Sequence, residues 1–232
     1  MKKSAYDTFL SVLLAILIIG VIGTAGYLCY KYYEKYRLNS DSDQFLNNFD
    51  QAVNTSNYDE SLYTDEEENN AIKEQTSSGN GVRGISSNAL KYKGYSVAGK
   101  LEMPTVNLQY PVLDQMTDAN AIEVSVAIQY GVGLNNVGNT VIIGHNYRSG
   151  LFFGSNKNLQ IGDDIYITDW ATGTRRKYVI YNKYSTNESD TSFYQRNTNG
   201  KREVSLVTCQ KNNAYRLVVL ARESEWYMRK MN

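Results

Sequence analysis

The sequence predicts a mostly β domain, folded as a closed or nearly closed barrel and preceded by one membrane-spanning helix. Three observations support this prediction. Many of the 20 tyrosines lie in short runs typical of strands. Most connections between these runs are short and rich in turn residues, which is typical of a barrel. An uncharged apolar run lies near the N-terminus. At 232 residues, the chain has room for one domain of ordinary size with appendages.

Composition excludes several classes of function. The formal net charge is zero, with 24 basic and 24 acidic side chains, so we expect no nucleic-acid partner. The sequence has two cysteines, Cys29 and Cys209, and one histidine, His145. These are too few for a zinc site of several Cys and His ligands, and we expect neither a metal nor another cofactor. Cys29 lies in the apolar run, so we expect no disulfide, and Cys209 is then a lone thiol in the folded part.

The apolar run at residues 9–30 is predicted to be a transmembrane anchor. As a helix it would span about 33 Å, enough for a bilayer core. It is longer than the roughly 7–15 residues of a signal-peptide core, which favours an anchor over a cleaved signal. Basic residues flank it on both sides and do not set its orientation. The short stretch 1–8 is expected to be a cytoplasmic tail, and the acidic stretch that follows the anchor favours an extracellular C-terminal domain.

Residues 31–90 are predicted to form an acidic, polar tether. Residues 39–80 carry ten acidic side chains and one basic side chain, Lys73, a composition that is difficult to bury. Four apolar residues within the tether fall at helical spacing: Phe45, Leu46, Phe49 and Val53. Two alternatives stay open for this segment, a short helix that docks on the domain and a disordered stalk.

Residues 91–232 are predicted to form the barrel. The expected strands are 95–103, 106–112, 140–144, 164–168, 176–181, 203–209 and 215–222. A helix is predicted over 118–130, because apolar residues recur there at helical spacing until glycines follow.

Three polar or reactive residues lie at predicted strand ends. Cys209 ends one strand, and Arg216 begins the next after a short polar connection. If these strands form a hairpin, Cys209 and Arg216 are neighbours. His145 follows another apolar strand, so three strand ends can converge at one rim of the barrel.

This set of residue types suits nucleophilic catalysis by cysteine. A cysteine attacks as the thiolate, which a nearby imidazole or guanidinium stabilises. Acyl transfer also needs donors to the oxyanion and an acid for the leaving amine. Arg216 and the backbone N–H of Gln210 can serve as donors, and His145 as the acid. The alternative is structural: Cys209 is then a small core residue, and Arg216 a solvated charge.

Three segments resemble the signature of the sortase family. Leu-Val-Thr-Cys at 206–209, followed by Arg-Leu-Val-Val at 216–219, is similar to the family's Thr-Cys strand end and Arg strand start. Residues 139–146 resemble its histidine segment, and residues 99–112 its opening strands. The resemblance covers roughly residues 92–223.

The resemblance implies an eight-stranded β-barrel with a few short helices, in a single-pass protein of the cell membrane whose barrel is a cysteine transpeptidase on the outer face. Such enzymes cleave a C-terminal LPXTG-like sorting motif of secreted proteins. They then pass the acyl group to an amine of a lipid-linked peptidoglycan precursor. Carried over by motif, Cys209 is the nucleophile, His145 the general acid/base and Arg216 the stabiliser of substrate and oxyanion. Thr208 and Gln210 are expected to contact substrate.

Several alternatives remain beside this interpretation. Arg222 shares a strand face with Arg216 but would lie about 20 Å further along the strand, so Arg216 is preferred. Residues 178–204, with a helical turn predicted at 190–194, resemble class B more than class A of the family. Glu188 and Asp190 are interpreted as solvated loop charges rather than calcium ligands. Other functions left open are a pilin-polymerising sortase, an inactive module that binds sorting signals and a nonspecific cysteine protease.

Overall fold

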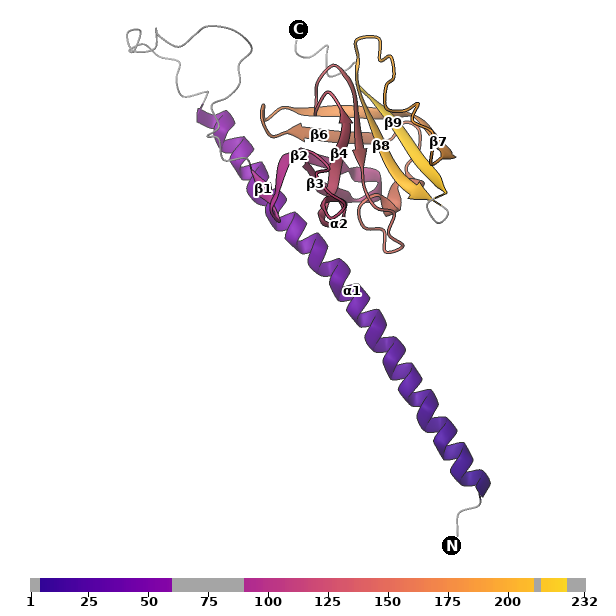
Figure 1. Ribbon diagram of the computed structural model, residues 1–232. Helices are drawn as coiled ribbons and strands as arrows, with labels where there is room; N and C mark the ends of the chain where they lie inside the picture. The colour runs from indigo at the N-terminus through magenta and orange to yellow at the C-terminus, as the bar shows by residue number, and fades with distance from the viewer. Residues whose placement is uncertain (1–4, 60–89, 211–213, 225–232) are drawn as a thin grey trace, which may run out of the picture. The chain divides into compact units, whose positions relative to one another are not determined.

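The computed structural model describes residues 5–59, 90–210 and 214–224 (Figure 1). The chain divides into two compact units, Met1–Asp41 and Ser42–Asn232. Helix α1 (Ala5–Asp59) makes up the described part of the first unit and contributes its last part to the second.

One helix among the described residues is long and apolar enough to cross a membrane. The qualifying segment lies within Phe9–Asn54, and none of its most apolar window is buried. It includes the run 9–30 that the sequence predicts to be an anchor. The criterion is one of length and composition, which an N-terminal signal sequence would also satisfy.

A closed β-barrel forms the body of the second unit (Figure 1). Its eight strands follow one another in the order β2, β3, β4, β5, β8, β9, β7 and β6, and β6 pairs back with β2 to close the ring. A two-residue strand, β1 (Lys91–Tyr92), adds to β2 outside the ring. The predicted fold class, a mostly β eight-stranded barrel, is therefore confirmed.

Seven of the eight barrel strands agree with the predicted strands to within a few residues, except that β7 is longer, and β4 was not predicted as a strand. The strands are β2 (Tyr95–Met103), β3 (Leu108–Leu113), β4 (Val126–Gly131), β5 (Gly138–Ile143), β6 (Asp164–Asp169), β7 (Arg175–Asn187), β8 (Arg202–Gln210) and β9 (Tyr215–Glu223). The short helices are α2 (Ala121–Val124) and the 3-10 turns η1 (Pro104–Val106) and η2 (Phe153–Asn158).

The helix predicted over 118–130 is wrong in its second half, because β4 occupies that stretch. Helix α2 ends at Val124, and Val126, Ala127 and Ile128 follow as consecutive buried residues of β4. Val126 and Ile128 belong to the cluster inside the barrel, whereas Ala127 belongs to a second apolar cluster. A strand covered on both faces lacks the alternation of a half-exposed strand, and its apolar run resembles a buried helix.

The last part of α1 packs against the barrel and completes this second cluster. Phe49 and Val53 lie in it with Val97 and Leu113 of the barrel strands. A charged pair adds to the packing: Asp50 accepts from Lys100, which is 5% exposed, at 2.6 Å. Of the two alternatives left open for this segment, the helix is the one observed; residues 60–89 lie outside the described residues.

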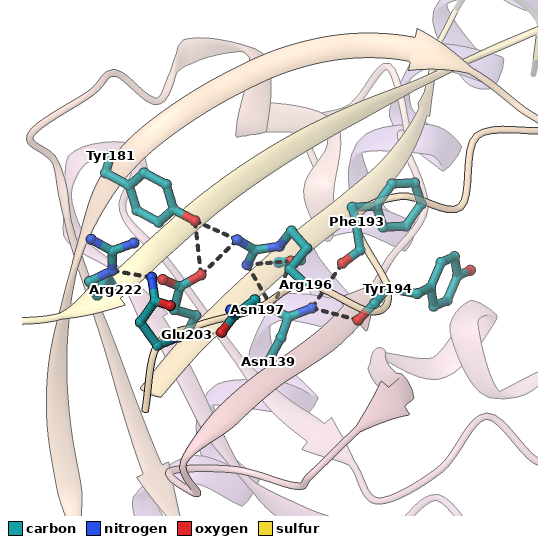
Figure 2. A network of polar contacts seen from close by, with 10 residues as sticks. Asn139, Tyr181, Phe193, Tyr194, Arg196, Asn197, Glu203 and Arg222 are labelled. Atoms are coloured by element: carbon teal, nitrogen blue, oxygen red, sulfur yellow. Dashed lines mark hydrogen bonds and ion pairs between the residues drawn. The ribbon is translucent and has the colours of Figure 1, made fainter. Parts of the chain in front are cut away.

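A buried carboxylate, Glu203 on β8, organises a polar network between the strands and the connection that joins β7 to β8 (Figure 2). Arg222 Nε donates to Glu203 Oε1 at 2.7 Å, and the Tyr181 hydroxyl donates to Oε2 at 2.9 Å. Arg196 of the connection forms an ion pair with Oε2 at 2.6 Å. Because both oxygens have cationic or hydroxyl partners, the charge can be buried without a large unpaired cost.

The same network fixes the backbone of the 188–201 connection. Arg196 donates to Asn139 Oδ1 at 2.9 Å, and Asn139 Nδ2 donates to the carbonyls of Phe193 and Tyr194 at 2.8 and 3.1 Å (Figure 2). The segment predicted as a helical turn forms a hydrogen-bonded turn, in which Tyr194 N donates to Thr191 O at 3.0 Å. Strand β5, which carries Asn139, therefore holds the turn in place.

Replacing Phe49 by Ala should destabilise the second unit by about 3–5 kcal/mol, because a fully buried ring of the docked helix is removed. Urea unfolding of residues 42–232 measures the change. Asn48→Ala, at an exposed position of the same helix, is the matched control and should change stability little. Equal effects of the two substitutions would show that the helix does not contribute through its buried face.

Replacing Arg196 by Met should lower the free energy of unfolding by about 2 kcal/mol, because hydrogen bonds of a largely buried cation are lost. The control is Arg175→Met, whose partly exposed side chain pairs with Glu102 at 3.0 Å and should cost about 1 kcal/mol or less. Denaturant unfolding compares the two variants. A larger loss at Arg175 would contradict the structural role given to the network.

Candidate active site

Cys209 and Arg216 lie directly opposite each other on neighbouring antiparallel strands. Strand β8 carries Cys209 near its end, β9 carries Arg216 near its start, and the register pairs the two residues. Directly opposed residues in such a ladder have Cα atoms about 4.5–5.5 Å apart. The cysteine is a free, half-buried thiol. The predicted hairpin neighbours are thus confirmed, although residues 211–213 of the connection lie outside the described residues.

His145 reaches the same end of β8 through the parallel pairing of β5 with β8. Ile143 is in register with Val207. Beyond the strand, Thr208 Oγ1 donates to Gly144 O at 2.6 Å, and Asn146 Nδ2 donates to Cys209 O at 2.7 Å. These bonds on either side of the histidine hold its backbone beside the Thr-Cys strand end.

A glycine before the histidine allows close packing. A Cβ at Gly144 would lie 2.9 Å from Val126 Cγ1 and 3.1 Å from the ring of Phe153. Any larger residue would push the chain away from the core just before His145, so the position of the histidine depends on this close approach.

One pocket of about 240 Å³ brings the predicted catalytic residues together. Cys209, His145 and Arg216 all line it, as does Thr208. Its remaining walls come from α2, β4, β5, β8 and the 188–201 connection: Ile122, Gln129, Ile143, Gly144, Glu188, Asp190, Thr191, Phe193, Tyr194 and Val207. The pocket thus combines a thiol, an imidazole and a guanidinium with an apolar floor.

The guanidinium of Arg216 supplies positive charge to this pocket. Arg216 Nη2 lies 3.9 Å from Glu188 Oε2, and the two side chains are 25% and 61% exposed. An ion pair this long and exposed is weak. Burial raises the pKa of the Tyr194 hydroxyl, and the positive charge of Arg216 opposes that rise. An oxyanion formed at Cys209 would lie in the same field.

Two acidic residues interpreted as solvated loop charges line the pocket as well. Glu188 is exposed, in agreement with that interpretation, but it faces Arg216. Asp190 accepts from the Thr186 hydroxyl at 2.6 Å, and this bond, with the backbone N–H of Ser192, lowers the pKa of the Asp190 carboxyl. Asp190 therefore stays ionised in the pocket wall, and the polar character of this wall was missed from the sequence.

The two residues predicted to contact substrate differ in their surroundings. Thr208 is buried, and its hydroxyl is used by Gly144, although the residue lines the pocket. The Gln210 side chain accepts from Ser185 Oγ at 2.8 Å, and Gln210 is not among the described residues that line the pocket. The contribution predicted for Gln210 is its backbone N–H and does not need the side chain.

Arg222, the rival of Arg216, lies toward the other end of β9. It is in register with Glu203, bonds to it, and stacks over the Tyr181 ring at 4.6 Å. Its charge is used within the polar network, whereas that of Arg216 faces the pocket.

Sequence reasoning missed two residues that contact His145. Glu123 of α2 approaches Nε2 at 2.9 Å, and the Tyr147 ring packs against the imidazole with centroids 5.1 Å apart. Tyr147 follows the histidine by two positions, which is a faint local signal. Glu123 precedes it by 22 positions on a four-residue helix, where no pattern points to it.

Comparison with known proteins agrees with this geometry. The family model described as a sortase domain matches residues 101–224, more than half of the chain. A curated relative, sortase A of Bacillus anthracis, is 28% identical over 126 residues, which are 53% of this chain and 58% of the relative.

Solved structures share the fold. Sortase A from Corynebacterium diphtheriae matches with a TM-score of 0.51 and 25% identity, over 56% of this chain and 61% of that one. A Clostridium perfringens sortase D5 transpeptidase matches with a TM-score of 0.50 and 20% identity, over 56% and 79% of the two chains, and shows the fold alone. This chain covers about three-fifths of the length of the Bacillus anthracis and Corynebacterium diphtheriae sortases. With a matching barrel and a family match over most of it, the chain belongs to the sortase family.

Proposed function

We propose that this chain is a cysteine transpeptidase that cleaves a C-terminal sorting motif of secreted proteins and transfers the acyl group to an amine of a peptidoglycan precursor. The observation that carries the proposal is the register of β8 and β9, which sets Cys209 opposite Arg216 in a pocket that His145 also lines. Membership of the family supports the reaction class.

The first half of the reaction forms a thioester. The thiolate of Cys209 attacks the carbonyl carbon of the scissile peptide bond, and Arg216 donates to the oxygen that becomes negative. As the C–N bond breaks, protonated His145 gives its proton to the leaving amine. The C-terminal fragment departs, and the acyl group remains on sulfur.

The second half returns the enzyme to its starting state. An amine attacks the thioester carbonyl, neutral His145 takes a proton from the amine nitrogen, and the C–S bond breaks. Arg216 stabilises the same oxygen position in both halves. The products are a new amide bond and the thiolate–imidazolium pair with which the cycle began.

The apolar helix and the family membership support a proposal for location and partners. The apolar part of α1 is proposed to anchor the chain as a single-pass protein of the cell membrane, with residues 1–8 cytoplasmic and the barrel extracellular. There it meets secreted proteins with an LPXTG-like motif and the lipid-linked precursor. The class B resemblance of residues 178–204 stays a prediction, and the relatives described above are named sortase A and sortase D5.

Incubation of the full chain in detergent with peptides ending in Leu-Pro-X-Thr-Gly-like or Asn/Ser-Pro-X-Thr-Gly/Asn-like motifs tests the proposal. With an added amine, mass spectrometry should detect the ligated product. Cys209→Ala should form none, because the nucleophile is gone.

Other outcomes separate the alternatives. Hydrolysis that an amine neither accelerates nor diverts would indicate a cysteine protease, and binding without turnover an inactive recognition module. Strong preference for a pilin lysine as acceptor would indicate pilus polymerisation. Full activity of Cys209→Ala would refute the mechanism.

Substitution of the two rival arginines should affect different properties, catalytic activity for Arg216 and stability for Arg222. Arg216→Ala should lower kcat/KM about 10²–10³-fold, the usual loss for one oxyanion donor. Arg222→Ala, its matched control on the same strand, should lower stability because Glu203 loses a partner, yet leave kcat of the folded protein nearly unchanged. Steady-state kinetics with thermal unfolding measures both. Normal activity of Arg216→Ala and loss in Arg222→Ala would reverse the assignment.

A further inference from the structure

Glu123 uses both of its carboxylate oxygens on residues around the histidine. Oε1 lies 2.9 Å from His145 Nε2, and Oε2 accepts the hydroxyl proton of Tyr147. His145 Nε2 is buried, and the Glu123 contact meets the distance of an ion pair rather than the alignment of a hydrogen bond. The contact is therefore an electrostatic one between the carboxylate and the Nε2 edge of the ring.

Tyr147 fixes the imidazole from a second side. Its ring lies 5.1 Å from the His145 ring and 5.8 Å from the ring of Phe152, which is buried in the barrel core. Because the tyrosine is held by a core residue at one face and by Glu123 at its hydroxyl, it restricts rotation of the histidine beside it.

The element that carries Glu123 is itself well held. Asp118 Oδ1 accepts the backbone N–H groups of Asn120 and Ala121, at 2.8 and 3.1 Å, before α2. After α2, the hydroxyl of buried Ser125 donates to Pro111 O at 2.6 Å. The Glu123 side chain is 55% exposed, so its pairing adds little stability, and its effect on the histidine is one of orientation.

We propose that Glu123 and Tyr147 are positioning residues for His145, which keep Nε2 toward the carboxylate so that Nδ1 exchanges the proton with the reacting groups. The inference rests on the proposed function. Nδ1–H of the imidazolium gives its proton to the leaving amine, and neutral Nδ1 takes one from the incoming amine. The Nε2 proton and the charge of Glu123 stay unchanged throughout, so each half-reaction moves one proton.

The single histidine of the sequence makes a direct test possible. In a proton–nitrogen correlation spectrum of the full chain in detergent micelles, all imidazole signals come from His145, because no other histidine is present. Wild type should show a proton held on Nε2. Glu123→Ala should shift the Nε2 resonance and speed exchange of its proton, while Glu102→Gln, which removes a carboxylate paired with Arg175 outside the pocket, should not.

Kinetics supplies the second readout. Glu123→Ala should lower kcat about tenfold, part of the roughly 10²–10⁴-fold that a general acid–base contributes, with KM for the peptide within about twofold. Tyr147→Phe should give a smaller fall in kcat. The double variant should fall no further than Glu123→Ala alone, because both residues act through His145.

Some outcomes would overturn the proposal. If Glu123→Ala left both the Nε2 resonance and kcat unchanged, Glu123 would not position His145. If Glu123→Ala raised KM at constant kcat, Glu123 would be a substrate contact instead. Failure of the wild type to transfer to an amine would refute the proposed function instead, and the resonance experiment does not depend on that activity.

Discussion

Strand β8 pairs in parallel with β5 and antiparallel with β9, and each register positions one part of the site. The β9 register sets Arg216 opposite Cys209, and the β5 register brings the chain before His145 beside Val207. A slip of one residue in either ladder would turn the side chains to the other face of the sheet. The apolar residues of β8 prevent this, since Val204 and Leu206 fill the barrel core while Val207 packs on the outer cluster.

The buried carboxylate of Glu203, also on β8, holds the pocket wall that the 188–201 connection forms. Glu203 lies six residues before Cys209, where Arg196 and Arg222 neutralise it (Figure 2). Desolvating such a carboxylate is costly unless it is fully paired, so the chain of the 188–201 connection must approach β8 closely enough for Arg196 to reach it. The turn that carries Phe193 and Tyr194 is placed as a consequence.

The parts of the site that could be predicted from sequence are those joined by local geometry. Cys209 and Arg216 are close in sequence, and a short polar connection between strands predicts a hairpin. His145 could be placed at a strand end, but its adjacency to Cys209 depends on a parallel pairing that residue spacing does not encode. Glu123 could not be found, because it acts from a single helical turn where a longer helix was predicted. The barrel itself followed from strand patterns, except at β4, which is covered on both faces.

The ring of strands is held unevenly. Two residue pairs join β3 to β4, Val112 with Val126 and Leu113 with Ala127, whereas β5 and β8 are in register from Gly138 to Ile143. Where this short ladder adjoins α2, the Ser125 hydroxyl adds a hydrogen bond from the end of the helix to Pro111 O of β3. The two sides of the pocket are therefore built differently: Cys209 lies on a long backbone ladder, whereas Ile122 lies on a short helix that side-chain bonds hold at its two ends.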